Sequence, residues 1–154
     1  MAYERIVVAA ALQRYLDMTP IAIRIRDLGE LIATAHNAPI HLISVDAPVE
    51  LLPGVETTAE KLERYADPLR ARGLGVETKL RKGRPSRAIE DYVQEVGADL
   101  LIMGSHSKRG PIDVGLGSTA SAISRELEAT VFLVRPTEIE QQKAQELMTV
   151  SYTH

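Results

Sequence analysis

The stretch DLLIMGSHSKRGPIDVGLGSTA (residues 99–120) carries the strongest indication of the fold. It begins with Asp99 and the apolar run 100–103, a pattern typical of a strand buried on both faces. Four glycines follow, at positions 104, 110, 115 and 117, and a helical pattern then runs from about Ser118 to Glu128. A strand that leads through a glycine-rich loop into a helix can direct backbone amides at phosphate groups. The alternative is that the glycines only shape a turn and that Ser118 only caps the helix.

The sequence on either side of this stretch alternates between the periodicities of strands and helices. Apolar or alternating runs predict four further strands, over residues 6–11, 40–45, 76–81 and 131–134. Three further helices are predicted to begin after Thr19, after Thr57 and near Pro85. Pro68 lies inside the second of these helices and is expected to kink it or end it early. Five strands alternating with four helices predict an α/β fold with a parallel sheet and right-handed crossovers.

Length and composition exclude several classes of protein. With 154 residues and 45% hydrophobic residues, the chain is expected to form a single domain with one core. It has no cysteine, so it can form no disulfide and no thiolate metal site. Its net charge of −3 gives no electrostatic reason to expect nucleic acid or anionic lipid as the main partner. The start MAYERIVVAA lacks the pattern of a signal peptide, and no apolar run could span a bilayer. We therefore expect a cytoplasmic protein without membrane insertion.

Five segments, taken in order, resemble the universal stress protein family over roughly residues 3–135. They are IVVAAALQ (6–13), HLISVD (41–46), KGRPSRAIEDYVQEVGADLLIMGSHSKRG (82–110), GLGSTASAI (115–123) and TVFLV (130–134). The resemblance implies a Rossmann-like open sheet of strand order 3-2-1-4-5, with helices on both faces. It assigns residues 1–136 to the universal stress protein domain and leaves residues 137–154 as a C-terminal tail. It also implies a stress-response regulator or adaptor that binds ATP in the crevice between strands 1 and 4.

The resemblance assigns a set of candidate nucleotide-binding residues to this crevice. These are Ala9, Ala11, Val45, Met103, Gly104, Ser107, Gly117, Ser118 and Thr119. Two of them depart from the family pattern, because Ala11 stands where ATP-binding members carry an aspartate and Ser107 stands where they carry a glycine. A methyl group cannot accept a hydrogen bond from ribose, which is typically worth about 0.5–1.5 kcal/mol net. Weakened ATP binding, another nucleotide, or none all remain open at this point.

The apolar strand Val131–Val134 predicts an assembly. In the implied strand order it forms one edge of the sheet, and the alternating strand VETKLR (76–81) forms the other. An exposed apolar edge promotes aggregation unless it is covered. We expect it to pair with the same strand of a second chain in a homodimer. The alternative is that the tail after Pro136, where Thr137 and Glu140 could cap a short helix, folds back over this edge.

The sequence contains no recognisable catalytic constellation. The four histidines lack the spacing of metal ligands, and Asp113 in the glycine-rich loop has no placed partner for acid–base chemistry. If ATP binds, Mg²⁺ or Mn²⁺ is the candidate metal, and any hydrolysis is expected to be slow. The leading hypothesis is a nucleotide-binding stress protein with an unidentified protein partner. The alternatives are a dimeric interaction module that binds no nucleotide, and a slow adenine-nucleotide hydrolase.

Overall fold

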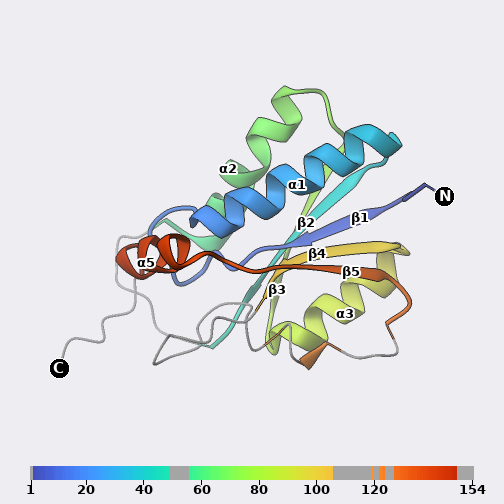
Figure 1. The fold of residues 1–154 in the computed structure, drawn as a ribbon. Coiled ribbons are helices and arrows are strands. Elements are labelled where there is room, and N and C mark those ends of the chain that lie inside the picture. The colour runs from blue at the N-terminus through green and yellow to red at the C-terminus, as the bar shows by residue number, and fades with distance from the viewer. Residues whose placement is uncertain (1, 49–55, 106–118, 120–121, 124–126, 149–154) are drawn as a thin grey trace.

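The fold is a single parallel sheet covered by helices (Figure 1). The computed structural model describes residues 2–48, 56–105, 119, 122–123 and 127–148. The sheet has the order β3-β2-β1-β4-β5, which confirms the order that the resemblance implies. Its strands are β1 (Ile6–Ala9), β2 (Ile40–Asp46), β3 (Val76–Lys82), β4 (Leu100–Gly104) and β5 (Thr130–Val134). The helices are α1 (Pro20–His36), α2 (Thr58–Ala71), α3 (Pro85–Val96) and α5 (Glu138–Glu146).

Side chains that alternate along the strands divide the core into two layers. In β1, Ile6 and Val8 pack with α1 and α2, whereas Val7 and Ala9 pack with α3 on the opposite face. All four of these side chains are almost fully buried, which explains why β1 is continuously apolar. From Val76 to Leu80, the edge strand β3 instead alternates between half-buried and exposed residues. The alternation of VETKLR therefore identified an edge strand correctly.

The helix caps that the sequence predicts are present. The Thr19 hydroxyl accepts a hydrogen bond from the Ala22 amide at the start of α1, and Asn37 ends this helix with a φ of 51°. Thr57 and Glu60 form the predicted capping box of α2. Gly97 ends α3 with a φ of 67°. Because these signals act within one turn of helix, they fix the boundaries without help from distant residues.

Two of the predicted boundaries are wrong. Helix α2 continues through Pro68 to Ala71, because Leu69 is fully buried and its packing holds the last turn in place. Proline at position 68 lacks only its own amide donor, so the helix loses one backbone hydrogen bond there. Strand β1 ends at Ala9 instead of Ala11, although the Ala10 amide still donates to the Ile43 carbonyl at 3.0 Å. The helix predicted over residues 118–128 lies mostly outside the described residues. Within this range, the described residues Thr119 and Ala122 are helical.

Helix α5 begins with the capping box that Thr137 and Glu140 predict. The helix packs against α1, and the Arg24 guanidinium donates to the Arg135 carbonyl at 2.7 Å. Just beyond it, the Leu147 carbonyl accepts a hydrogen bond of 2.6 Å from the Leu16 amide. Leu133 on β5 remains 52% exposed, so α5 does not cover this side chain.

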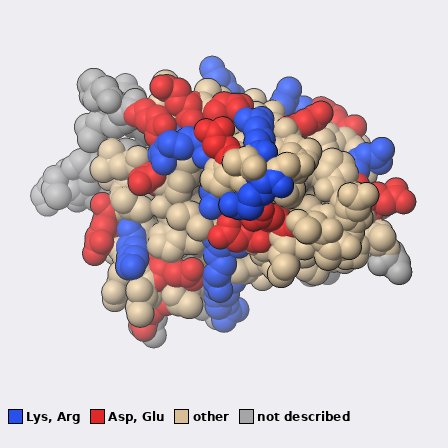
Figure 2. All heavy atoms as spheres, turned by 90° about the horizontal axis from the view of Figure 1, so that it is seen from above, with Lys and Arg blue, Asp and Glu red and all other residues tan. Residues whose placement is uncertain are grey.

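Charged side chains of both signs are intermingled on the surface above α1 and α2 (Figure 2). Several form ion pairs within or between these helices, such as Arg72 with Glu30 and Arg70 with Glu63. This surface therefore presents no large field of one sign that would attract a polyanion. No helix of the described residues is both long and apolar enough to cross a membrane.

Candidate functional site

The candidate site lies where the order of the strands reverses along the sheet. Along the chain, β1 connects through α1 to β2 on one side, while β4 pairs with β1 on the other. In this register Ala9, the last residue of β1, lies between Ile43 of β2 and Met103 near the end of β4, while β2 continues to Asp46. In open α/β sheets, ligands bind outside the carboxyl ends of the strands at such a reversal.

Three of the candidate residues pack on the same face of the sheet. Ala9 and Met103 belong to the apolar cluster on the α3 side, and Val45 packs against that cluster. Ala9 and Met103 are 1% and 0% exposed, so their side chains belong to the core beneath the ends of β1 and β4. Val45 and Ala11 are only half-buried.

Gly104 is the last residue of β4, and its φ is not positive. A Cβ at this position would lie 3.5 Å from Cγ1 of Ile21 and 3.9 Å from the Val134 carbonyl oxygen, which are ordinary contact distances. Neither the backbone conformation nor the neighbours therefore require glycine at position 104. The Cβ direction also shows that this position faces α1, on the opposite side of the sheet from Met103.

The remaining candidate residues belong to the glycine-rich stretch. Thr119 is helical and only 4% exposed. Ser107, Gly117 and Ser118 lie outside the described residues. Their roles toward phosphate groups stay predictions from the sequence.

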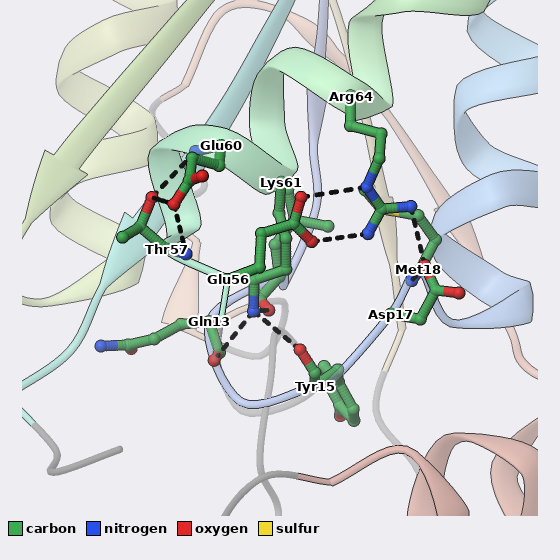
Figure 3. A network of polar contacts seen from close by, with 10 residues as sticks. Gln13, Tyr15, Asp17, Met18, Glu56, Thr57, Glu60, Lys61 and Arg64 are labelled. Carbon is green, nitrogen blue, oxygen red and sulfur yellow. Dashed lines mark hydrogen bonds and ion pairs between the residues drawn. The ribbon is translucent and has the colours of Figure 1, made fainter. Parts of the chain in front are cut away.

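The loop that follows β1 is held by a buried lysine (Figure 3). Lys61 of α2 is 1% exposed, and its ammonium group donates to three backbone carbonyls of this loop. The Nζ–O distances are 2.6 Å to Leu12, 3.2 Å to Gln13 and 2.7 Å to Tyr15. Burying an ammonium group is unfavourable unless such acceptors surround it. The positive charge of Lys61 therefore fixes the backbone directly after Ala11.

Two further interactions attach the start of this loop to β2. The side-chain amide of Gln13 pairs with the backbone of Ala47, donating to its carbonyl and accepting from its amide, both at 2.9 Å. The Ser44 hydroxyl donates to the Ala10 carbonyl at 2.8 Å. The backbone around Ala11 thus has a defined position before any ligand binds.

Arg64 connects the far end of the loop to α2. Its guanidinium group donates to Asp17 at 2.9 Å and to Glu56 at 2.7 Å (Figure 3). The Met18 amide, followed by Arg64, holds the pKa of Asp17 below its usual range. The hydrogen bond from Arg64 likewise lowers the pKa of Glu56. Both carboxylates are therefore charged at neutral pH, and their role is to position the loop.

Sequence reasoning missed Lys61 as a residue that shapes this site. A signal was present, because Lys61 occurs at the spacing of the buried positions 58, 62, 65, 66 and 69 of α2. A buried lysine on an apolar helix face requires hydrogen-bond acceptors for its ammonium group, but the sequence does not show which residues provide them. They lie 46 to 49 residues earlier in the chain.

The described residues contain no cluster of three or more histidine, aspartate or glutamate side chains that could hold a metal ion. The described residues offer the buried apolar side chains of Ala9 and Met103, the half-buried Val45 and Ala11, and a loop held by Lys61. This arrangement suits the binding of a flat, largely apolar group beside a polar one.

Comparisons with known proteins agree with one another. The model of the universal stress protein family matches residues 2–135. Universal stress protein Sll1388 of Synechocystis is 28% identical over 76 residues, which is 49% of each chain, so the match spans about half of that relative.

Two solved structures share the fold over most of their length. One is a universal stress protein in complex with cAMP, 25% identical, with a TM-score of 0.63 and coverage of 89% of this chain and 100% of that one. The other is the universal stress protein of Archaeoglobus fulgidus in complex with dAMP. It is 20% identical, with a TM-score of 0.59 and coverage of 87% and 99%.

Proposed function

Because this chain belongs to the universal stress protein family, we propose that it binds an adenine nucleotide at the carboxyl ends of β1 and β4. The observation that carries the proposal is the reversal of strand order at this edge, with Val45 and Ala11 half-buried beside it. Two similar structures were solved with the adenine nucleotides cAMP and dAMP. The residues present fit such a ligand, because Val45 can pack against a base while the loop held by Lys61 limits movement of Ala11.

The more detailed proposal is ATP, accompanied by Mg²⁺ or Mn²⁺. The amides and hydroxyls around Gly117, Ser118 and Thr119 would bind the phosphates, and the phosphates would supply most of the ligands to the metal. Ala11 offers no hydrogen bond to the ribose, so the affinity of this protein is expected to be lower than that of a chain with a carboxylate there. Any hydrolysis is slow, which product analysis after prolonged incubation with ATP would check.

The test is calorimetry with AMP, ADP and ATP, the last with Mg²⁺, on the wild type and two valine variants. Gly117→Val should abolish binding while the far-UV spectrum and the cooperativity of unfolding stay unchanged. Gly75→Val is the matched control, because Gly75 is exposed just before β3 and a Cβ there would have no atom within 4 Å. No heat and no thermal shift at millimolar nucleotide with the wild type would refute the proposal. Equal binding by both variants would place the ligand elsewhere.

A second candidate function, that of a dimeric interaction module, is favoured by the exposed Leu133 on the edge strand β5. We propose a homodimer through Val131–Val134, and Leu133→Lys should convert it to a monomer in light scattering after size exclusion. Leu31→Lys is the matched control, since Leu31 is 67% exposed on α1. A wild type that is monomeric at high micromolar concentration would refute the homodimer.

A role as a cytoplasmic stress-response regulator or adaptor rests on the family alone. In such a role, nucleotide occupancy would change the surface that a protein partner recognises. Hydrogen exchange with and without ATP would test the first step. Protection should rise in the loop after β1, over residues 12–18. Unchanged exchange in the presence of saturating ATP would contradict it.

A further inference from the structure

Two buried side-chain oxygens of the described residues have no hydrogen-bond partner in the protein. They are Oδ1 of Asp46 and Oγ of Ser105. Asp46 is the last residue of β2, and Ser105 directly follows β4, so both lie at the carboxyl ends of strands. Nearly all buried polar atoms in folded proteins are hydrogen-bonded, so each exception requires an explanation.

The two oxygens lie on opposite faces of the sheet. Asp46 alternates in phase with Leu42, which packs toward α1 and α2, and its charge interacts favourably with Lys61 of α2. Ser105 alternates in phase with Met103 on the α3 face. The phase holds because the Ser105 amide still donates to the Val134 carbonyl at 2.9 Å and continues the ladder. The Asp46 oxygen thus has a nearby opposite charge, whereas the Ser105 hydroxyl has no such compensation.

Ser105 lies at the carboxyl end of β4, beside the end of β1 that leads to Ala11. Ala9, the last residue of β1, is in register with Met103, and Ala11 and Ser105 each follow that pair by two residues, beyond the ends of their strands. The methyl group of Ala11 can make no hydrogen bond, whereas the hydroxyl of Ser105 can both donate and accept one. A serine side chain has a single staggered torsion, so the hydroxyl can turn toward a ligand at small cost.

We propose that the Ser105 hydroxyl hydrogen-bonds a ribose hydroxyl of the bound adenine nucleotide and so replaces the interaction that Ala11 cannot make. This inference rests on the proposed function. A neutral hydroxyl next to the apolar floor of Ala9 and Met103 suits the uncharged sugar. The phosphates are instead assigned to the amides of the glycine-rich stretch, which lies farther along the chain.

The first test compares stability without nucleotide. Removing a buried hydroxyl that has no partner should not destabilise the fold, so Ser105→Ala should melt at the same temperature as the wild type or slightly higher. Ser44→Ala is the matched control, because its hydroxyl is also buried but donates to the Ala10 carbonyl. That variant should melt about 2–4 °C lower. A comparable loss for Ser105→Ala would show that its hydroxyl has a protein partner and would overturn the inference.

The second test measures affinity for AMP, 2′-deoxy-AMP and 3′-deoxy-AMP by calorimetry. Ser105→Ala should bind AMP about three- to tenfold more weakly than the wild type. The loss should disappear with the deoxy analogue that lacks the contacted hydroxyl, because the partner is then already absent. An equal loss for all three nucleotides, or no loss for any, would overturn the inference while leaving the proposed function intact. Failure of the wild type to bind AMP, ADP or ATP would instead overturn the proposed function and this inference with it.

Discussion

Replacing Lys61 with methionine tests whether its buried ammonium group organises the loop after β1. Methionine keeps an unbranched apolar side chain in the same packing, but it cannot donate to the carbonyls of Leu12, Gln13 and Tyr15. Removing one partner from a buried charged network typically costs about 3–5 kcal/mol. Relief from burying the ammonium group and hydration of the freed carbonyls offset part of this cost. We expect the free energy of unfolding to fall by about 3 kcal/mol.

Urea denaturation followed by circular dichroism measures this loss. For a chain of this length the melting temperature should also fall by about 6–12 °C. Arg70→Met is the matched control on the same helix, because its ion pair with Glu63 is largely exposed and is worth at most about 1 kcal/mol. Amide exchange over residues 12–17 should accelerate in Lys61→Met and not in the control. A loss below about 1 kcal/mol for Lys61→Met would refute the reasoning.

Three further predictions concern packing, pH and the candidate site. Gly29→Ala should lower the free energy of unfolding in urea by about 1–2 kcal/mol, because a Cβ there would lie 2.7 Å from Cγ2 of Val8. Burial lowers the pKa of His41 below 6.5, although the charge of Glu77 opposes this shift. The free energy of unfolding should therefore fall as the pH drops below about 6.5, because the unfolded chain then binds a proton more readily at this histidine than the folded protein does. In His41→Gln the free energy of unfolding should depend less on pH. Ala11→Asp should strengthen ATP binding about three- to tenfold in calorimetry, and unchanged affinity would exclude this position from the site.

Much of the fold could be predicted because its signals are local. Thr19 with Pro20, Thr57 with Glu60, and Thr137 with Glu140 mark helix starts within four residues of each other. The strand pattern also distinguished the central strand β1 from the edge strand β3. Capping and alternation are satisfied by near neighbours and by the polarity of the surroundings, so a sequence pattern is enough to identify them.

The candidate site was predictable only in part. The resemblance named Ala9, Val45 and Met103, and the register and packing of the sheet bring these three residues to one edge and one face. Lys61 and Ser105 were not among the candidates. Their importance depends on what surrounds each side chain in space, and a lysine or serine in a sequence does not reveal whether its polar atoms are buried or paired.

By itself, the sequence determined the five strands and the caps of the helices, because periodicity and capping depend on residues that are neighbours along the chain. The order of the sheet was predicted only through the resemblance to the universal stress protein family. Only the tertiary structure decided that α2 runs through Pro68, that α5 packs on α1, and that Lys61 donates hydrogen bonds to the loop after β1. It also decided that the buried Ser105 hydroxyl at the end of β4 is left without a hydrogen-bond partner. These outcomes depend on burial and on contacts between residues far apart in the chain, where packing and desolvation outweigh local preference.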